Sequence, residues 1–138
     1  MPHIVISVLK GMSYQKKKSL ARDIARVVSE NVGLPYDMVA GEVSFADIPL
    51  ENCAPAQDFT EDNPPLAVRY ITFNILRGRP LEQKRKLSKD ITEVVAKCIG
   101  VPARTEGIAI EITEVDPANI AHGGVLTIDM EKPPLPIT

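Results

Sequence analysis

The sequence predicts an α+β fold in which a duplicated β-α-β unit forms one four-stranded sheet with two helices on one face. The first observation behind this prediction is an internal repeat: when the 138-residue chain is shifted by 67 residues against itself, identical residues coincide without a gap. The second is that each copy has a β-branched run followed by a stretch with helical periodicity. A period this long, present twice, indicates a duplicated small domain. The coinciding residues include Ile4 and Ile71, Gly11 and Gly78, Lys17 and Lys84, Asp23 and Asp90, and Gly33 and Gly100.

The first strand and the long helix of each copy are marked most clearly. The runs IVISVL at 4–9 and ITFNIL at 71–76 are typical of strands, and a glycine follows each of them. Helices are predicted over Ser13–Val32 and Pro80–Ile99, because apolar residues recur on one face of each stretch. Pro80 suits a first helical turn, and Gly33 and Gly100 suit the position just after a helix end.

A second strand is predicted after each helix, at about Val39–Phe45 and Gly107–Thr113. Strand, helix and strand at this spacing indicate parallel pairing within each copy. We therefore expect residues 1–138 to form a single domain of two repeats, at about 2–54 and 68–124. The polar, proline-rich segment at about 55–67 reads as a linker, and 129–138 as an irregular tail.

One face of the predicted sheet has no cover. Along the first strand, Ile4, Ile6 and Val8 are apolar, but so are Val5 and Leu9, which point to the opposite face. Two helices can cover only one face of four strands. The other face is expected to pack against further copies of the chain.

Composition excludes several classes of function. The formal net charge of −2 argues against nucleic acid as a partner, because phosphate binding requires a concentrated positive field. Cys53 and Cys98 provide neither a disulfide framework nor metal-ligand spacing. No stretch has the length of a membrane span, and the first apolar run is too short for a signal peptide. We expect a cytoplasmic protein with no membrane partner.

The residue behind the initiator methionine allows two interpretations. Proline is tolerated as the first residue of a strand, where no N–H is needed for pairing. Alternatively, removal of Met1 turns Pro2 into a free secondary amine at the start of a strand. In a duplicated fold only one copy has a chain terminus, and the matching position in the second copy is Arg69. One such amine site per chain is therefore expected.

Three stretches together resemble the tautomerase superfamily. The segments ILRGRPLEQK at 75–84 and ITEVDPANIAHGG at 112–124 are similar to 4-oxalocrotonate tautomerase. The opening MPHI and the segment 110–119 are similar to carboxymethyl-hydroxymuconate isomerase and macrophage migration inhibitory factor. The resemblance covers about residues 2–128 and implies a homotrimer whose sheets form an inner barrel. It also implies an active site at the N-terminal proline, with no metal and no organic cofactor.

Arg77 and Arg79 are the candidate substrate-binding cations. Arginine binds carboxylates through paired hydrogen bonds, and both residues flank Gly78 at a predicted strand-to-helix turn. Arg79 resembles a substrate-binding arginine of 4-oxalocrotonate tautomerase, and the pair resembles the R-x-R motif of malonate semialdehyde decarboxylase. The alternative is two exposed arginines beside a helix start. A positive pair there opposes the helix dipole, which favours the functional interpretation.

Three further residues are candidates through the resemblance. Glu111 matches a position at which relatives place a polar active-site side chain, with an outward strand residue as the alternative. Ile120 matches a pocket-lining aromatic of 4-oxalocrotonate tautomerase. His122 precedes Gly123 and Gly124 in a predicted hairpin and matches a carboxylate of cis-chloroacrylate dehalogenase, with a solvated loop histidine as the alternative.

The favoured function is that of a cofactor-independent isomerase. Pro2 would be the general base toward an unsaturated 2-hydroxy or 2-oxo carboxylic acid, desolvated by Ile4 and Ile120. Arg77 and Arg79 would hold the carboxylate of this small-molecule substrate and stabilise the dienolate. Two alternatives stay open: a decarboxylase, hydratase or dehalogenase acting on a three-carbon acid with Pro2 as general acid, and a binding protein without turnover. The second arginine of 4-oxalocrotonate tautomerase is missing, since Ala109 and Glu42 stand at its positions.

Overall fold

The computed structural model describes residues 2–53, 65–103, 105 and 107–130. Most of the predicted linker and of the predicted tail therefore lies outside the described residues. The first half contains β1 (His3–Leu9), α1 (Tyr14–Val32), α2 (Tyr36–Ala40), β2 (Val43–Ile48) and the 3-10 helix η1 (Leu50–Asn52). The second half contains β3 (Val68–Leu76), α3 (Leu81–Ile99), β4 (Ile110–Val115), η3 (Pro117–Asn119), β5 (Ala121–His122), β6 (Val125–Leu126) and η4 (Thr127–Asp129).

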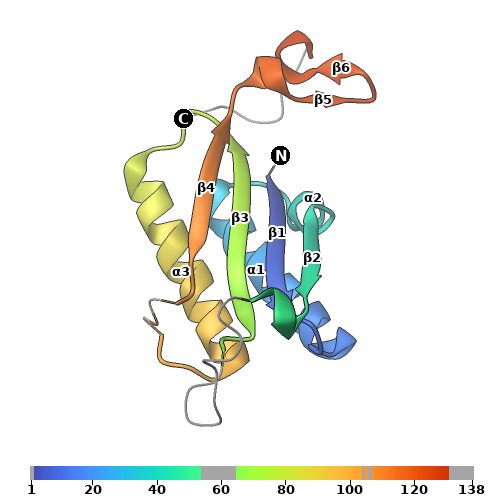
Figure 1. The fold of residues 1–138 in the computed structure, drawn as a ribbon. Helices are drawn as coiled ribbons and strands as arrows, with labels where there is room; N and C mark the ends of the chain where they lie inside the picture. The colour runs from blue at the N-terminus through green and yellow to red at the C-terminus, as the bar shows by residue number, and fades with distance from the viewer. Residues whose placement is uncertain (1, 54–64, 104, 106, 131–138) are drawn as a thin grey trace.

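Four strands form one mixed sheet in the order β2-β1-β3-β4. β1 pairs in parallel with β2, and β3 pairs in parallel with β4, whereas the central pair β1 and β3 is antiparallel. Both long helices lie on the same face of the sheet (Figure 1). The predicted fold class is confirmed: two β-α-β units share one four-stranded sheet.

The long helices and the outer strands of the two halves repeat one another. α1 and α3 begin and end 67 positions apart, and so do β2 and β4. Both helices end at a left-handed glycine, Gly33 or Gly100, each with φ 73°. An ion pair is repeated as well: Lys17 binds Asp47 in the first half, and Lys84 binds Glu114 in the second. The predicted helix bounds are confirmed to within one residue, with Ser13 and Pro80 as N-caps.

The core lies between the helices and one face of the sheet. Ile4, Ile6 and Val8 of β1 are completely buried, whereas the residues between them are only half-buried. Phe73 of β3 is paired with Ile4 and is also 0% exposed. Complete burial of such a side chain contributes about 1.5–3 kcal/mol to folding. The central strands therefore hold the two halves together through the core.

The predicted second strands begin too early. Val39 belongs to the short helix α2, and β2 starts only at Val43. Pro35 caps α2, and Val39 enters the core from the helix, so its burial does not require an extended backbone. In the second half the strand starts at Ile110, because a turn closed by the Ile108 N–H and the Thr105 carbonyl precedes it.

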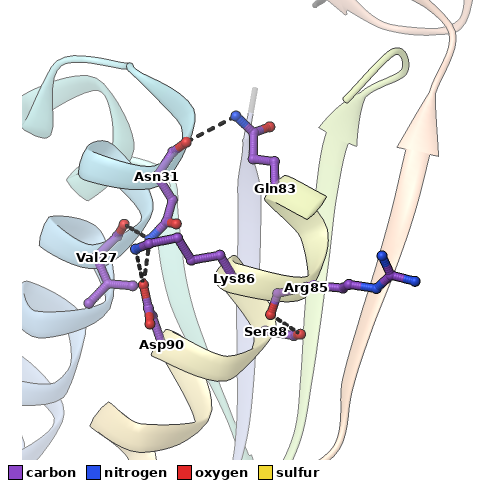
Figure 2. Close-up of polar contacts among 7 residues, drawn as sticks. All are labelled: Val27, Asn31, Gln83, Arg85, Lys86, Ser88 and Asp90. Carbon is purple, nitrogen blue, oxygen red and sulfur yellow. Dashed lines mark hydrogen bonds and ion pairs between the residues drawn. The ribbon is translucent and has the colours of Figure 1, made fainter. Parts of the chain in front are cut away.

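A polar cluster joins α1 to α3 (Figure 2). Asn31 Nδ2 donates to Asp90 Oδ2 at 3.0 Å and to the Val27 carbonyl at 2.9 Å, while Lys86 Nζ binds the same Asp90 oxygen at 2.6 Å. Gln83 Nε2 donates to the Asn31 carbonyl at 3.0 Å. These contacts fix the start of α3 beside the end of α1.

Asp90 gives the protein an acid-sensitive contribution to stability. Lys86, and then Asn31, lower the pKa of Asp90 by hydrogen bonding to its carboxylate. A depressed pKa in the folded state stabilises it above the ordinary carboxyl pKa of about 3.9, and this contribution is lost as pH falls through the folded-state pKa. We expect Asp90→Asn to be less stable than wild type toward urea at pH 7, with the difference shrinking below about pH 4.

The matched control is Asp23→Asn, 67 residues earlier. Asp23 pairs with Arg26 at 3.3 Å, and both side chains are exposed. Such pairs contribute about 0–1 kcal/mol, so little change in urea stability is expected. An equal loss in both variants would contradict a special role for the Asn31–Asp90 cluster.

Candidate active site

The sheet topology brings three chain segments to one edge. Because β1 is antiparallel to β3, the start of β1 lies beside the end of β3, and β4 ends at the same edge. In Figure 1 the N-terminal end, the arrowheads of β3 and β4, and the β5–β6 hairpin all lie at this end of the molecule. This edge, defined by Pro2, the 77–79 turn and residues 114–122, is called the Pro2 edge below.

Pro2 is a buried residue directly before β1. The register pairs His3 with Asn74, and its continuation by one residue sets Pro2 opposite Ile75, which is 2% exposed. Two residues further on, Ile4 points into the core, so Pro2 lies on the helix-covered side of the sheet. The position behind Met1 is thus fixed by regular strand pairing and excluded from bulk water.

Arg77 is held at the end of β3 by a second strand. Its backbone N–H donates to the Val115 carbonyl at 3.0 Å, and its guanidinium forms an ion pair with Asp116. The Arg77 side chain is 57% exposed, and that of Asp116 is 31% exposed. The next residue, Gly78, has φ 104°, a conformation that side chains with a Cβ rarely adopt. The predicted tight turn between the arginines is confirmed.

Arg79 extends toward the end of α1 and not into solvent. Its Nη1 donates to the carbonyl of Val32, the last residue of α1, at 3.1 Å. Burial lowers the pKa of Arg79, and its Nε is buried without a hydrogen-bond partner. The C-terminus of α1 carries partial negative charge, which offsets the dipole of α3 at this point. The dipole of α3 therefore no longer favours a functional role for Arg79, because the end of α1 compensates it.

Glu114 is a residue of this edge that the sequence reasoning missed. It pairs with Lys84 of α3, and the Lys84 hydrogen bond lowers the pKa of Glu114, with a further contribution from the Gly78 N–H. One carboxylate thus ties the turn between the arginines to α3. The sequence repeat contained a signal for Glu114. Lys17 and Asp47 occupy the positions equivalent to Lys84 and Glu114, and they form the same kind of ion pair.

Glu111 lies elsewhere. It is paired across the sheet with Thr72, on the open face, and accepts a hydrogen bond of 2.7 Å from the Tyr70 hydroxyl. This hydrogen bond is the main cause that raises the pKa of Tyr70. Since Glu111 is three residues before Glu114 and points to the opposite face, one chain does not bring its side chain together with Pro2.

Ile120 and His122 lie on the segment beyond β4. Ile120 is half-buried after η3, and its carbonyl accepts the Thr127 N–H at 2.8 Å. His122 is exposed in β5 and is paired with Val125 of β6. The predicted hairpin is confirmed, with Gly123 and Gly124 at φ 60° and 81° in its turn. The chain path after β4 thus carries both residues to the Pro2 edge.

The other end of the β1–β3 pair is equivalent to the Pro2 edge by the internal repeat. There the end of β1 meets the start of β3, and the Leu9 N–H donates to the Ala67 carbonyl at 2.8 Å. A surface cavity of about 490 Å³ lies beside it, lined by residues that include Lys10, Gly11 and Met12. Lys10 and Met12 stand where the Pro2 edge has Arg77 and Arg79. The arginine pair is therefore not required by the fold.

Sequence comparison identifies the family. The family model described as tautomerase enzyme matches residues 70–129. A probable tautomerase of Lactiplantibacillus plantarum is 36% identical over 61 residues, which cover 44% of this chain and 92% of the relative. This chain belongs to the tautomerase family. A probable tautomerase of Bacillus cereus is also 36% identical, over 55 residues that cover 40% of this chain and 87% of the relative. Family membership supports an isomerase-type enzyme.

Solved structures with the tautomerase fold match both halves of the chain. A native fused 4-OT superposes with a TM-score of 0.81 at 20% identity, covering 95% of this chain and 100% of its own. A fused 4-OT described as an asymmetric trimer gives a TM-score of 0.80 at 18% identity over the same shares. N1, a member of the cis-3-chloroacrylic acid dehalogenase family, gives 0.66 at 21% identity, covering 91% of this chain and 82% of its own. The duplicated architecture is thus shared with fused 4-OT proteins.

The described part of this tautomerase contains neither a candidate metal centre nor a candidate membrane-spanning helix. Within it, no three His, Cys, Asp or Glu side chains form a group that could hold a metal ion. Among the helices described, none combines the length and the apolar character needed to cross a membrane.

Proposed function

We propose that this tautomerase isomerises unsaturated 2-hydroxy carboxylic acids to 2-oxo acids, with the secondary amine of Pro2 as the general base after removal of Met1. The observation that carries the proposal is the antiparallel pairing of β1 with β3. It sets a buried Pro2 at the edge where Arg77 and Arg79 follow β3. This arrangement of three residues from distant parts of the chain supports the proposed assignment of a base and two cations.

The proposed reaction is a proton transfer across a conjugated system. The Pro2 nitrogen takes the proton of the 2-hydroxyl group. The C2=C3 double bond is replaced by the C2=O carbonyl, and the C4=C5 double bond moves to C3=C4. The resulting ammonium returns the proton to the carbon at the far end of the diene, so no atom is gained or lost. General base catalysis of this kind contributes typically 10²–10⁴-fold to the rate.

The electrostatics of the Pro2 edge suit this role. Burial of an amine disfavours its charged form, and a nearby cation does the same. Arg79 provides a half-buried positive charge, and of its five N–H donors only one Nη1 bond, to Val32, is accounted for. The remaining Nη donors can bind a substrate carboxylate and stabilise the negative charge of the dienolate.

We further propose that the active protein is a homotrimer. The face of the sheet away from the helices carries half-buried Val5 and Leu9 and the 39%-exposed Tyr70. The β5–β6 hairpin adds Val125 and Leu126, which are 48% and 38% exposed. Apolar surface of this extent is typical of an interface, and two fused 4-OT proteins with this fold are described as trimers.

Light scattering during gel filtration tests the assembly. We expect a mass of about three times the 15.1 kDa of one chain. Val5→Lys places a charge in the middle of the open face and should shift the protein to smaller species, because burial of an unpaired charge is costly. Ser19→Lys, on the exposed side of α1, should remain trimeric. A wild-type monomer at micromolar concentration would contradict the proposed assembly.

The N-terminus tests the chemistry. Intact-mass measurement of the purified protein shows whether Met1 is present, and ultraviolet absorbance follows conversion of the monocarboxylate 2-hydroxyhexa-2,4-dienoate to its 2-oxo isomer. We expect turnover from the form lacking Met1 and none from a form whose Pro2 nitrogen is joined to a preceding residue. Equal turnover by both forms would contradict the proposal, and Pro2 would then have only a structural role at the start of β1.

A further inference from the structure

Most of the charged side chains at the Pro2 edge are paired with a side chain of opposite charge. Five charged side chains converge on it: Arg77, Arg79, Lys84, Glu114 and Asp116. Lys84 is paired with Glu114, and Arg77 is paired with Asp116. Among the residues that the structure describes at this edge, only Arg79 is a cation without a carboxylate partner; its Nη1 donates to a backbone carbonyl. Two ion pairs therefore leave a single uncompensated positive charge.

The repeat shows which of these pairs the fold requires. The Lys84–Glu114 pair recurs as Lys17–Asp47, so it belongs to the repeated architecture. The backbone bond from the Arg77 N–H to the Val115 carbonyl, 3.0 Å, also recurs, as the 2.9 Å bond from Lys10 to Ile48. The Arg77–Asp116 pair does not recur, because Pro49 stands at the position equivalent to Asp116.

Asp116 is not needed for the local turn either. Its Oδ1 accepts the Ala118 N–H at 2.9 Å and caps the 3-10 helix η3. The equivalent 3-10 helix η1 forms with Pro49 as its N-cap and without any side-chain cap. Backbone geometry thus explains neither the carboxylate at 116 nor its contact with Arg77. Its contact with Arg77 at the Pro2 edge makes this carboxylate a candidate for recognition of the substrate.

We propose that Asp116 is a specificity-determining residue that selects monocarboxylate over dicarboxylate substrates. The inference rests on the proposed function, since it assigns a substrate class to the same site. By occupying Arg77, Asp116 leaves Arg79 to bind one carboxylate. A second carboxylate would enter beside Asp116 without a free cation, and an unpaired anion in a partly buried site is strongly disfavoured.

Binding of two unreactive acids tests the proposal without depending on turnover. Sorbate (hexa-2,4-dienoate) and muconate (hexa-2,4-dienedioate) share one diene and differ in the number of carboxylates. Their dissociation constants are measured by calorimetry with wild type and Asp116→Asn. Asparagine keeps an oxygen that can accept the Ala118 N–H, so the turn is retained. We expect muconate to bind about tenfold more tightly to the variant, as one charge-assisted hydrogen bond becomes available, with sorbate changed less than about threefold.

Two further variants complete the test. Asp47→Asn removes the repeated type of ion pair at the far end of the sheet and should leave the ratio of the two dissociation constants unchanged. Arg77→Ala added to Asp116→Asn should abolish the gain for muconate. An unchanged ratio in Asp116→Asn, an equal change in Asp47→Asn, or binding of neither acid overturns the inference. Failure of the proposed function has a different signature, a shifted ratio of dissociation constants with no turnover of the monocarboxylate 2-hydroxyhexa-2,4-dienoate.

Discussion

Replacement of Pro2 by alanine should lower kcat by roughly 10²–10⁴-fold, the contribution of a positioned general base. Alanine keeps an amine at the chain terminus but makes it primary and more mobile, because the ring that fixes the backbone at this position is gone. The buried start of β1, next to the pairing of His3 with Asn74, would hold the proposed amine in place in wild type. Stopped-flow absorbance with a 2-hydroxydienoate measures the change, while thermal unfolding checks that the fold is kept.

The pH dependence of the same reaction identifies the base. In wild type we expect kcat/KM to rise with pH through an apparent pKa below that of an unperturbed proline amine, because burial and Arg79 both favour the neutral form. The apparent pKa should move upward in Arg79→Met and less so in Arg77→Ala, whose charge Asp116 already offsets. His3→Ala, at the exposed neighbouring position, serves as the control and should keep the wild-type profile. A Pro2→Ala enzyme with full activity would exclude Pro2 as the base.

Arg79→Met should lower kcat/KM by about 10–150-fold, the range that follows from loss of a charge-assisted hydrogen bond of about 1.5–3 kcal/mol. Methionine is the residue that the chain itself uses at the equivalent position, Met12, so the backbone of the turn tolerates it. The loss should appear in both KM and kcat if the contact strengthens as the dienolate forms. Steady-state kinetics and melting temperature are measured on the same preparation.

The structural contact of Arg79 makes this variant informative. If Arg79 only satisfies the Val32 carbonyl at the end of α1, Arg79→Met lowers the melting temperature and leaves kcat/KM unchanged. If it binds substrate, kcat/KM falls by far more than stability explains. Arg85→Met, on the exposed side of α3 with Glu82 as its ion-pair partner, is the control for loss of an arginine and should change neither quantity appreciably.

The fold could be predicted well from the sequence because its signals are local and occur twice. Helix ends are fixed by glycines with left-handed backbone, and each of the two helices confirms the other. The second strands were placed too early because Val39 is apolar in a helix as well as in a strand. Periodicity over five residues cannot separate these two cases, and only the path after Pro35 decides between them.

The candidate site could be predicted only in part. Pro2 and the arginines come to one edge through strand pairing, which the repeat implies. The direction of a side chain depends on partners that are distant in sequence: Arg77 meets Asp116 across two strand ends, and Arg79 reaches Val32 on another helix. Glu111 lies on a strand as expected, but within one chain it faces away from Pro2, a direction that resemblance alone does not give. Resemblance located these positions and gave no information about their rotamers.

The antiparallel contact of β1 with β3 relates the two halves by an approximate twofold axis, and covalent connectivity breaks that symmetry. In backbone terms the chain has two equivalent edges, yet removal of Met1 would create an amine at only one of them, at Pro2. At the other, residue 69 is an internal amide that no side-chain change converts to an amine. The two edges therefore differ chemically because of chain connectivity, although their backbone geometry is alike. Two similar β-α-β units within one polypeptide can therefore diverge, one under the proposed demand for reactivity at Pro2 and the other without it.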